Sequence, residues 1–235
     1  MKIPIKFDSA AKTYAKYNLI QQKVITELIA NIAPTYDKVL DLGCGNGGIY
    51  DAFKIKPRYF TGVDISSTML SLHQKNKNTR LIQCSFDDFD IKEDYDLVIS
   101  SSALQWSKDL DSLMKKISNH TKHIAFGIFT ALSMREIHNF LGIESPILNK
   151  ADILKIVARY FDIVHYNKTY SIDFETTKDL FLYIRNSGIG GYNLLNYQDS
   201  KKLLTDFRST TLSFEVVYVY DKGTRMEIIK ENRGN

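Results

Sequence analysis

Two carboxylates and a run of glycines in the first third of the chain have the types and spacing of a site for a nucleoside-containing ligand. Residues 39–48 read Val-Leu-Asp-Leu-Gly-Cys-Gly-Asn-Gly-Gly, an apolar, strand-like stretch that runs into a glycine loop. The glycines are Gly43, Gly45, Gly47 and Gly48. Without a Cβ, such residues can turn sharply, adopt positive φ angles and let a ligand approach the backbone closely. Asp64 lies 21 positions after Gly43, at the end of the next strand-like stretch, where a carboxylate can accept hydrogen bonds from a ribose diol.

Asp41 helps to distinguish between two kinds of cofactor. Gly43, Gly45 and Gly48 also fit the G-x-G-x-x-G pattern of dinucleotide-binding proteins, whose loop holds a pyrophosphate. An acid two residues before the first glycine would set a negative charge beside that anion, so it suits a cationic group better. S-adenosylmethionine carries an ammonium and a sulfonium and no phosphate. Asp-Leu-Gly-Cys-Gly resembles the first motif of the class I S-adenosylmethionine-dependent methyltransferases, which favours this cofactor over a dinucleotide.

The composition is that of a single globular domain. At 235 residues with 44% hydrophobic content, the chain can bury a sizeable core. It has only two cysteines, Cys44 and Cys84, which argues against a disulfide framework and predicts a reducing, cytoplasmic location. Neither a signal peptide nor a run of about 18 apolar residues is evident, so we expect no export and no membrane insertion.

The net charge of +4, from 31 Lys and Arg against 27 Asp and Glu, is too small to predict nucleic-acid binding. The excess of positive charge is concentrated near the N-terminus. Residues 1–23 contain Lys2, Lys6, Lys12, Lys16 and Lys23 against Asp8 alone. This basic segment could steer an acidic partner protein, or it could be the solvated face of a helix.

Strand-like and helical patterns alternate in the order that a parallel, helix-covered sheet requires. An N-terminal helix is predicted from apolar residues at three-to-four-residue steps, namely Ala10, Tyr14, Tyr17, Val24 and Leu28. Strands are expected at residues 38–42, 59–64, 80–84, 97–100 and 123–129, with helices at 67–74 and 110–119. Ligands bind at the carboxyl ends of such strands, so one rim should carry Asp41, Asp64, Ser85 and Ser100.

The second half of the chain is expected to shape the substrate side. Asn149 to Asp152 has the pattern of a capped helix start, and a strand is expected at 161–174. Helices follow at 179–184 and 199–207, and a last strand at 212–220. We expect one domain over residues 1–235, with an N-terminal lid helix (1–33), a cofactor-binding half (34–130) and a substrate half (131–235). Within the last, a helical insertion at about 175–198 should join the N-terminal helix as a lid over the cofactor.

Three further stretches narrow the resemblance. They are residues 7–14 (Phe-Asp-Ser-Ala-Ala-Lys-Thr-Tyr) followed by Gln21, residues 100–106 (Ser-Ser-Ser-Ala-Leu-Gln-Trp) and residues 185–191 (Arg-Asn-Ser-Gly-Ile-Gly-Gly). These are similar to stretches of the malonyl-acyl carrier protein O-methyltransferases of biotin synthesis, and with the glycine loop they span residues 7–191. The resemblance implies an α/β, Rossmann-like class I methyltransferase, with a mostly parallel seven-stranded sheet, helices on both faces and a helical lid.

The sequence departs from this family at two places. Ser101 stands where relatives usually carry Asn, which puts one active-site contact in doubt. Ser85-Phe86 stands where they usually carry Asp-Ala beside the adenine, which shifts the adenine-facing role to Ser85, Phe86 or Asp87.

The implied reaction is transfer of a methyl group from S-adenosylmethionine to the free carboxylate of a malonyl thioester on acyl carrier protein. The ester product would prime pimeloyl assembly. A carboxylate is already an anion at neutral pH, so it needs no general base, and the enzyme would act chiefly by positioning the reactants. This agrees with a sequence that contains no obvious catalytic dyad.

The resemblance also suggests roles for individual residues. Arg185, favoured over Arg135, could hold the malonyl carboxylate in bidentate fashion. Trp106 would face the sulfonium or anchor the next helix in the core, and Gln105 would donate to a substrate oxygen. Tyr14 would close over the cofactor from the same helix face as Gln21, or simply pack there. The full set of candidate cofactor-binding residues is Asp41, Gly43, Gly45, Gly47, Asp64, Ile65, Ser85, Phe86, Ser100 and Gln21.

Two other functions remain open at this point. The chain could methylate another small carboxylate or metabolite, or it could be a non-catalytic module that binds S-adenosylmethionine. We expect no metal, because His120 and His123 have no accompanying cysteine or carboxylate cluster. Cys44 is expected to be a small packing residue of the loop and not a nucleophile.

Overall fold

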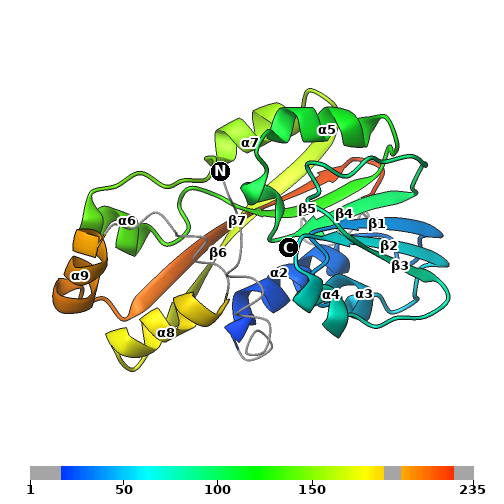
Figure 1. The fold of residues 1–235 in the computed structure, drawn as a ribbon. Coiled ribbons are helices and arrows are strands. Elements are labelled where there is room, and N and C mark those ends of the chain that lie inside the picture. The colour runs from blue at the N-terminus through cyan, green and yellow to red at the C-terminus, as the bar shows by residue number, and fades with distance from the viewer. Residues whose placement is uncertain (1–16, 188–196, 225–235) are drawn as a thin grey trace, which may run out of the picture.

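The computed structural model describes residues 17–187 and 197–224, and within them seven strands form one sheet (Figure 1). The strand order is β3-β2-β1-β4-β5-β7-β6. The strands are β1 (Lys38–Leu42), β2 (Tyr59–Asp64), β3 (Thr79–Gln83), β4 (Leu97–Ser101), β5 (Ile124–Phe129), β6 (Ile163–Asp173) and β7 (Thr211–Asp221). β1 to β5 pair in parallel, and β7 runs antiparallel to both β5 and β6. This is the predicted fold class.

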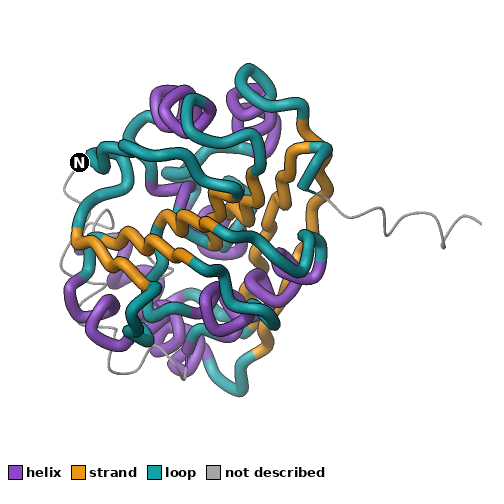
Figure 2. Tube along the Cα trace, turned by 90° about the vertical axis from the view of Figure 1, so that its right-hand side faces the viewer, coloured by secondary structure: helices purple, strands orange, loops and turns teal. Residues whose placement is uncertain are grey.

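Helices cover both faces of the sheet. They are α2 (Leu19–Ala30), α3 (Gly48–Ala52), α4 (Ser67–Leu72), α5 (Leu110–Ser118), α6 (Arg135–Leu141), α7 (Lys150–Val157), α8 (Thr177–Ser187) and α9 (Tyr197–Asp206), and a 3-10 turn, η1, covers Leu104–Trp106. Figure 1 shows α5 and α7 above the sheet and α2, α3 and α8 below it. In Figure 2 the strands run through the middle of the molecule between the two helical layers.

The alternation of side chains along each strand explains these two layers. On β5, Ile124, Phe126 and Ile128 belong to the core shared with α5 and α7, whereas Ala125 and Phe129 belong to the core on the α2 side. Successive strand residues point to opposite faces, so an uninterrupted apolar strand supplies both cores at once. Gly127 lies between them on the α2 side, where a Cβ would come within 2.7 Å of Val24 Cγ1. The glycine therefore lets α2 lie directly against β5.

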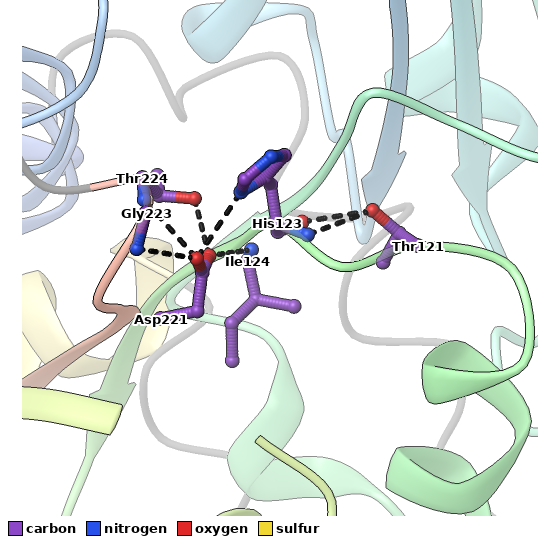
Figure 3. Close-up of polar contacts among 6 residues, drawn as sticks. All are labelled: Thr121, His123, Ile124, Asp221, Gly223 and Thr224. Carbon is purple, nitrogen blue, oxygen red and sulfur yellow. Dashed lines mark hydrogen bonds and ion pairs between the residues drawn. The ribbon is translucent and has the colours of Figure 1, made fainter. Parts of the chain in front are cut away.

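A single carboxylate ties β5 to β7 at the end of the sheet where β5 begins (Figure 3). Asp221 accepts hydrogen bonds from the backbone N–H groups of Ile124 (2.7 Å), Gly223 (2.8 Å) and Thr224 (3.1 Å). It also accepts one from the Thr224 hydroxyl and lies 3.1 Å from His123 Nδ1. These bonds fix where β5 starts, and so they help to set the position of the residues at its other end.

Most of the predicted elements are present. β1 and β2 have the predicted bounds, and β3, β4 and β5 differ from prediction by one residue at an end or at both. Asn149 caps α7 as predicted, since its side-chain oxygen accepts the Asp152 N–H at 2.9 Å. The helix expected at 179–184 is longer, Thr177–Ser187, and the part of the N-terminal helix that contains Ala10 and Tyr14 lies outside the described residues.

Two short helices, α3 and α6, are present that the sequence pattern did not predict. α3 is only five residues long and follows the glycine loop directly. α6 begins at Arg135, and its N-cap residue, Met134, has a φ of +57° and makes no side-chain cap hydrogen bond. Neither helix start carries the Ser, Thr, Asp or Asn signal on which such predictions depend. None of the helices in the described ranges has both the length and the apolar character needed to cross a bilayer.

Candidate active site

The glycine loop connects β1 to α3 and adopts three positive φ angles, at Gly43 (+79°), Gly45 (+52°) and Gly47 (+93°). At Gly43 a second constraint applies, because a Cβ there would lie 2.3 Å from the Cβ of Ala103. Ala103 follows β4 and directly precedes η1. Gly43 is therefore required both by its backbone conformation and by the close approach of the loop after β4.

Asp64 closes β2 and organises the turn around the glycine loop. One carboxylate oxygen accepts the Gly45 N–H at 2.9 Å and the other accepts the Ser66 N–H at 2.8 Å. Asp64 also lines the cavity described below, at the end of β2 where the sequence predicts a contact to a ribose diol.

Asp41 is a buried carboxylate with an unusual environment. Its relative exposure is 0%, and neither carboxylate oxygen has a hydrogen-bond partner among the described residues. Burial raises the pKa of Asp41 well above its usual range, and the nearby charge of Asp64 raises it further. A buried anion without a partner is costly, so this position favours a ligand that brings a positive charge.

One cavity lies at the carboxyl ends of the parallel strands. It is lined by Gln21, Gly43, Asp64, Ile65, Met69, Ser85, Phe86, Asp87, Ser101, Ser102, Ala103, Gln105, Trp106, Phe129, Ser133, Met134, Pro146, Ile147 and Ser187. The charged residues in this lining are Asp64 and Asp87, both acids, with no lysine or arginine among these described residues. The cavity therefore has an acidic side near the glycine loop and an apolar side formed by Phe129, Met134, Pro146 and Ile147.

The loop after β4 presents Gln105 and Trp106 to the cavity. Ser102, with a φ of +60°, turns the chain out of the strand, and its carbonyl accepts Gln105 Nε2 at 2.7 Å. This leaves Gln105 Oε1 buried and without a hydrogen-bond partner in the described structure. Trp106 is half-buried. A left-handed residue other than glycine is strained, and such strain concentrates where a loop must present side chains to a ligand.

The segment after β5 supplies the apolar wall and is fixed to β7. The Thr130 hydroxyl donates to the buried carboxylate of Glu215, and the Ser133 hydroxyl donates to the Glu215 carbonyl at 3.0 Å. Met134 has a φ of +57° and donates its N–H to Ser213 O at 2.6 Å. Ser102 and Met134 are the two non-glycine residues with positive φ in the described ranges, and both line the cavity.

Sequence reasoning did not identify Lys116. Its ammonium, on α5, donates to the carbonyls of Phe86 (3.4 Å), Asp87 (2.7 Å) and Phe89 (2.8 Å) and so holds the loop after β3. No local sequence signal points to this role, because the loop lies 27 to 30 positions away in the chain.

The cavity brings eight of the predicted site residues together. They are Gln21, Gly43, Asp64, Ile65, Ser85, Phe86, Gln105 and Trp106. Gln21, on α2, donates from Nε2 to Ser187 O at 3.1 Å, which joins this helix to the end of α8.

The other predicted site residues lie elsewhere. Asp41, Gly45 and Gly47 lie in β1 or its glycine loop outside the lining, and the hydroxyl of Ser100 donates to Leu42 O at 2.6 Å. Arg185 is an exposed residue of α8 outside the lining, and Tyr14 lies outside the described residues.

Within the described residues, no group of three or more His, Cys, Asp or Glu side chains is placed to hold a metal ion. His123 instead lies beside Asp221 at the opposite end of β5 from the cavity, and His120 lies 3.4 Å from Asp94. Cys44 is buried, and burial raises the pKa of its thiol, with the charges of Asp41 and Asp64 adding to the effect. A thiol held neutral in this way is a packing group, as predicted.

Comparison with known families supports the reading of the glycine loop. Residues 39–123, which include the loop, Asp64 and the Gln105-Trp106 turn, match the family model described as a methyltransferase domain. The chain contains a class I methyltransferase domain. The dinucleotide alternative is thereby set aside, and the expectation of a methyltransferase enzyme is confirmed.

Relatives of this methyltransferase extend the similarity beyond the cofactor half. It is 24% identical to the malonyl-[acyl-carrier protein] O-methyltransferase of Bacillus cereus, across 93% of this chain and 90% of the relative. It is 26% identical to the protein of the same name from Haemophilus influenzae, across 88% of this chain and 84% of the relative. The family resemblance drawn from the motifs is confirmed.

Solved structures agree on the fold. A candidate methyltransferase of an antibiotic biosynthesis pathway from Anabaena variabilis is similar with a TM-score of 0.62, at 13% identity, over 83% of this chain and 96% of that one. A candidate methyltransferase from Bacillus halodurans gives a TM-score of 0.59, at 12% identity, over 84% and 97%. At these identities the likeness shows the fold alone.

Proposed function

We propose that this methyltransferase transfers the methyl group of S-adenosylmethionine to the free carboxylate of a malonyl thioester on acyl carrier protein. The malonyl methyl ester would then prime pimeloyl assembly for biotin synthesis. The observation that carries the proposal is the similarity to malonyl-[acyl-carrier protein] O-methyltransferases over 93% of the chain, which includes the substrate half.

The residues around the glycine loop fit the methyl donor. When bound, S-adenosylmethionine supplies an electrophilic methyl group on a sulfonium. Asp41 is a buried carboxyl group whose ionised form a ligand ammonium would stabilise, and Asp64 would accept hydrogen bonds from the ribose hydroxyls. Ile65 and Phe86 offer apolar surface on the same side of the cavity, and Ser85 offers a hydroxyl.

The acceptor side of the cavity can position a nucleophile that is already charged. A carboxylate with an ordinary pKa near 4 needs no deprotonation before it attacks. The protein must hold its oxygen about 3 Å from the methyl carbon, in line with the bond that breaks, and exclude water. Orientation of this kind can contribute roughly 7 to 11 kcal/mol to the lowering of the barrier. Gln105, Trp106 and Phe129 are the rigidly placed groups available for it.

We further propose that Arg185 pairs with the malonyl carboxylate. It lies on α8, two residues before Ser187, which lines the cavity. Within the lining, the hydroxyls of Ser101 and Ser102 lie 3.4 Å apart, and either can act as a donor. Replacing Arg185 with Ala should then raise the KM for the malonyl substrate, while the same change at the exposed Arg135 should not.

Intact-protein mass spectrometry tests the reaction directly. Malonyl-acyl carrier protein is incubated with the enzyme and S-adenosylmethionine, with malonyl-coenzyme A in a parallel reaction. Gain of one methyl group on the malonyl moiety supports both the reaction and the substrate. If the enzyme binds S-adenosylmethionine by titration calorimetry and neither substrate gains a methyl group, the proposed acceptor is wrong.

The second candidate function is methylation of another small carboxylate or metabolite. The observation that favours it is the acceptor side of the described cavity, which contains serine hydroxyls and apolar groups but no fixed cation. The same mass-spectrometric assay, run with a panel of small carboxylic acids, separates the two candidates.

A further inference from the structure

Two loops that line the cavity are joined by one side chain, Asp87. The first is the loop after β3, with Ser85 and Phe86, and the second is the loop after β4, with Gln105 and Trp106. Asp87 Oδ1 accepts the Ser107 hydroxyl at 2.6 Å, and Oδ2 accepts the Lys108 N–H at 3.0 Å. Both carboxylate oxygens are therefore directed across the gap between the loops.

The loop that carries Asp87 is itself firmly held. The N–H groups of Asp88 (3.0 Å) and Phe89 (2.9 Å) donate to Ser85 O, which makes a compact turn of residues 85–89. Lys116 donates to three carbonyls of this turn. Because the turn is fixed from both sides, the direction of the Asp87 carboxylate is fixed as well.

The two groups that donate to Asp87, the Ser107 hydroxyl and the Lys108 N–H, belong to the residues that directly follow η1. Ser107 N donates to Leu104 O at 3.0 Å, and Trp106 N donates to Ala103 O at 3.0 Å, so Ser107 belongs to the same turn as Trp106. A hydrogen bond to a carboxylate is shorter and stronger than one between neutral groups. The bond at Ser107 therefore fixes the position of the residue immediately after Trp106.

We infer that Asp87 is a positioning residue that couples occupation of the adenosine side of the cavity to the placement of Gln105 and Trp106. The inference rests on the proposed binding of S-adenosylmethionine, with its adenine against Ser85 and Phe86. A ligand that contacts these two residues acts on the turn that contains Asp87. Asp87 transmits a displacement of this turn to η1 through its hydrogen bonds to Ser107 and Lys108. Both oxygens of Asp87 are directed at Ser107 and Lys108, and the inference assigns the adenine contact to Ser85 and Phe86.

Trp106 makes the inference measurable, because it is the only tryptophan in the chain. Its emission and its quenching by acrylamide therefore report on the surroundings of this one residue of η1, and the comparison with Asp88→Ala separates the effect of Asp87 from direct shielding by the ligand. The variant is Asp87→Ala, and the matched control is Asp88→Ala, which removes the same charge from the next residue, whose side chain is 67% exposed and contacts Lys108 Nζ only at 3.5 Å. Each protein is measured alone and with saturating S-adenosylhomocysteine.

In the wild type and in Asp88→Ala, S-adenosylhomocysteine should change the quenching of Trp106. In Asp87→Ala we expect most of this ligand-dependent change to be lost and kcat for methyl transfer to fall about tenfold, as for loss of hydrogen bonds to a charged group. The Kd for S-adenosylhomocysteine should change less than about threefold, because the binding groups themselves remain. Ser107→Ala removes one of the two bonds and should show a smaller effect of the same sign, which keeps the inference testable if Asp87→Ala fails to fold.

Three results would overturn the inference. The first is that Asp87→Ala behaves like Asp88→Ala. The second is that wild-type Trp106 does not respond to S-adenosylhomocysteine. The third is that Asp87→Ala loses affinity for this ligand as strongly as it loses kcat, which would make Asp87 a direct ligand. The fluorescence comparison uses no acceptor, so it stands or falls separately from the proposal that the acceptor is malonyl-acyl carrier protein.

Discussion

Replacing Asp41 with Asn should make the folded protein more stable at alkaline pH and make it bind S-adenosylmethionine more weakly. Asp41 is completely buried, and its two oxygens have no hydrogen-bond partner among the described residues. Asn has nearly the same shape but cannot ionise. The substitution therefore removes the ionisable group without opening a cavity.

The direction and size of the pH effect follow from the shift in pKa. Burial, with a further contribution from Asp64, raises the pKa of Asp41 in the folded protein, whereas the unfolded chain has an ordinary value near 3.9. Between the two values the folded protein keeps a proton that the unfolded chain has released. The free energy of unfolding should then fall by up to about 1.4 kcal/mol for each unit of rising pH. This loss of stability is absent at pH values below the pKa of Asp41 in the unfolded chain, and it is complete above the pKa of Asp41 in the folded protein.

The assay is urea unfolding at pH 5 and pH 8, for the wild type, Asp41→Asn and the exposed control Asp37→Asn. The free-energy advantage of Asp41→Asn over the wild type should grow by about 1 kcal/mol or more between the two pH values, and Asp37→Asn should show no such change. Affinity for S-adenosylmethionine should drop roughly 10-fold to 100-fold, because a charged hydrogen bond of about 1.5 to 3 kcal/mol is lost. An advantage that does not vary with pH, or unchanged affinity, would refute the reasoning.

Three further outcomes are expected. Gly43→Ala should lower the free energy of unfolding by about 2 kcal/mol or more in urea titration, because a left-handed alanine costs roughly 1 to 2 kcal/mol and its Cβ would also overlap Ala103. Lys116→Met should weaken S-adenosylhomocysteine binding about tenfold by calorimetry, since the carbonyls it holds belong to the loop beside the proposed adenine site. Iodoacetamide should label Cys84 before Cys44 in mass spectra of tryptic peptides, because burial raises the pKa of the Cys44 thiol.

Matched controls isolate each cause. Gly142→Ala has the same kind of backbone strain, at a φ of +68°, but no atom lies within 4 Å of the new Cβ. Any larger loss of unfolding free energy in Gly43→Ala therefore measures the overlap with the Ala103 Cβ. Lys115→Met changes an exposed neighbour and should leave ligand affinity unchanged. Equal losses within either pair would contradict the structural explanation. Equal labelling rates of Cys44 and Cys84 in the folded protein would contradict the explanation from burial.

Local pattern was sufficient to predict the fold and the cofactor side of the site. The strand-glycine-helix sequence around Gly43 and the acid at Asp64 are close in the chain, and each depends on backbone properties of individual residue types. The alternating and continuous apolar runs gave the strands because burial on both faces of a parallel sheet selects such runs. The same strand pattern predicted Asp41, Asp64, Ser85 and Ser100 on one rim, of which Asp64 and Ser85 line the cavity, whereas Phe86, Gln105 and Trp106 were assigned through the family resemblance.

Contacts between distant segments were decided only by the tertiary structure. Lys116 holds a loop about 30 residues away, and Glu215 fixes the wall at Thr130 from 85 residues away. Nothing in the local sequence marks either residue, because a lysine on a helix or a glutamate on a strand usually faces water. Arg185 depends on both levels: its motif predicts a site residue, and the structure places it on α8, exposed and two residues before Ser187 of the cavity lining. Local preferences determine which elements form, whereas the packing of those elements against one another determines which polar side chains meet.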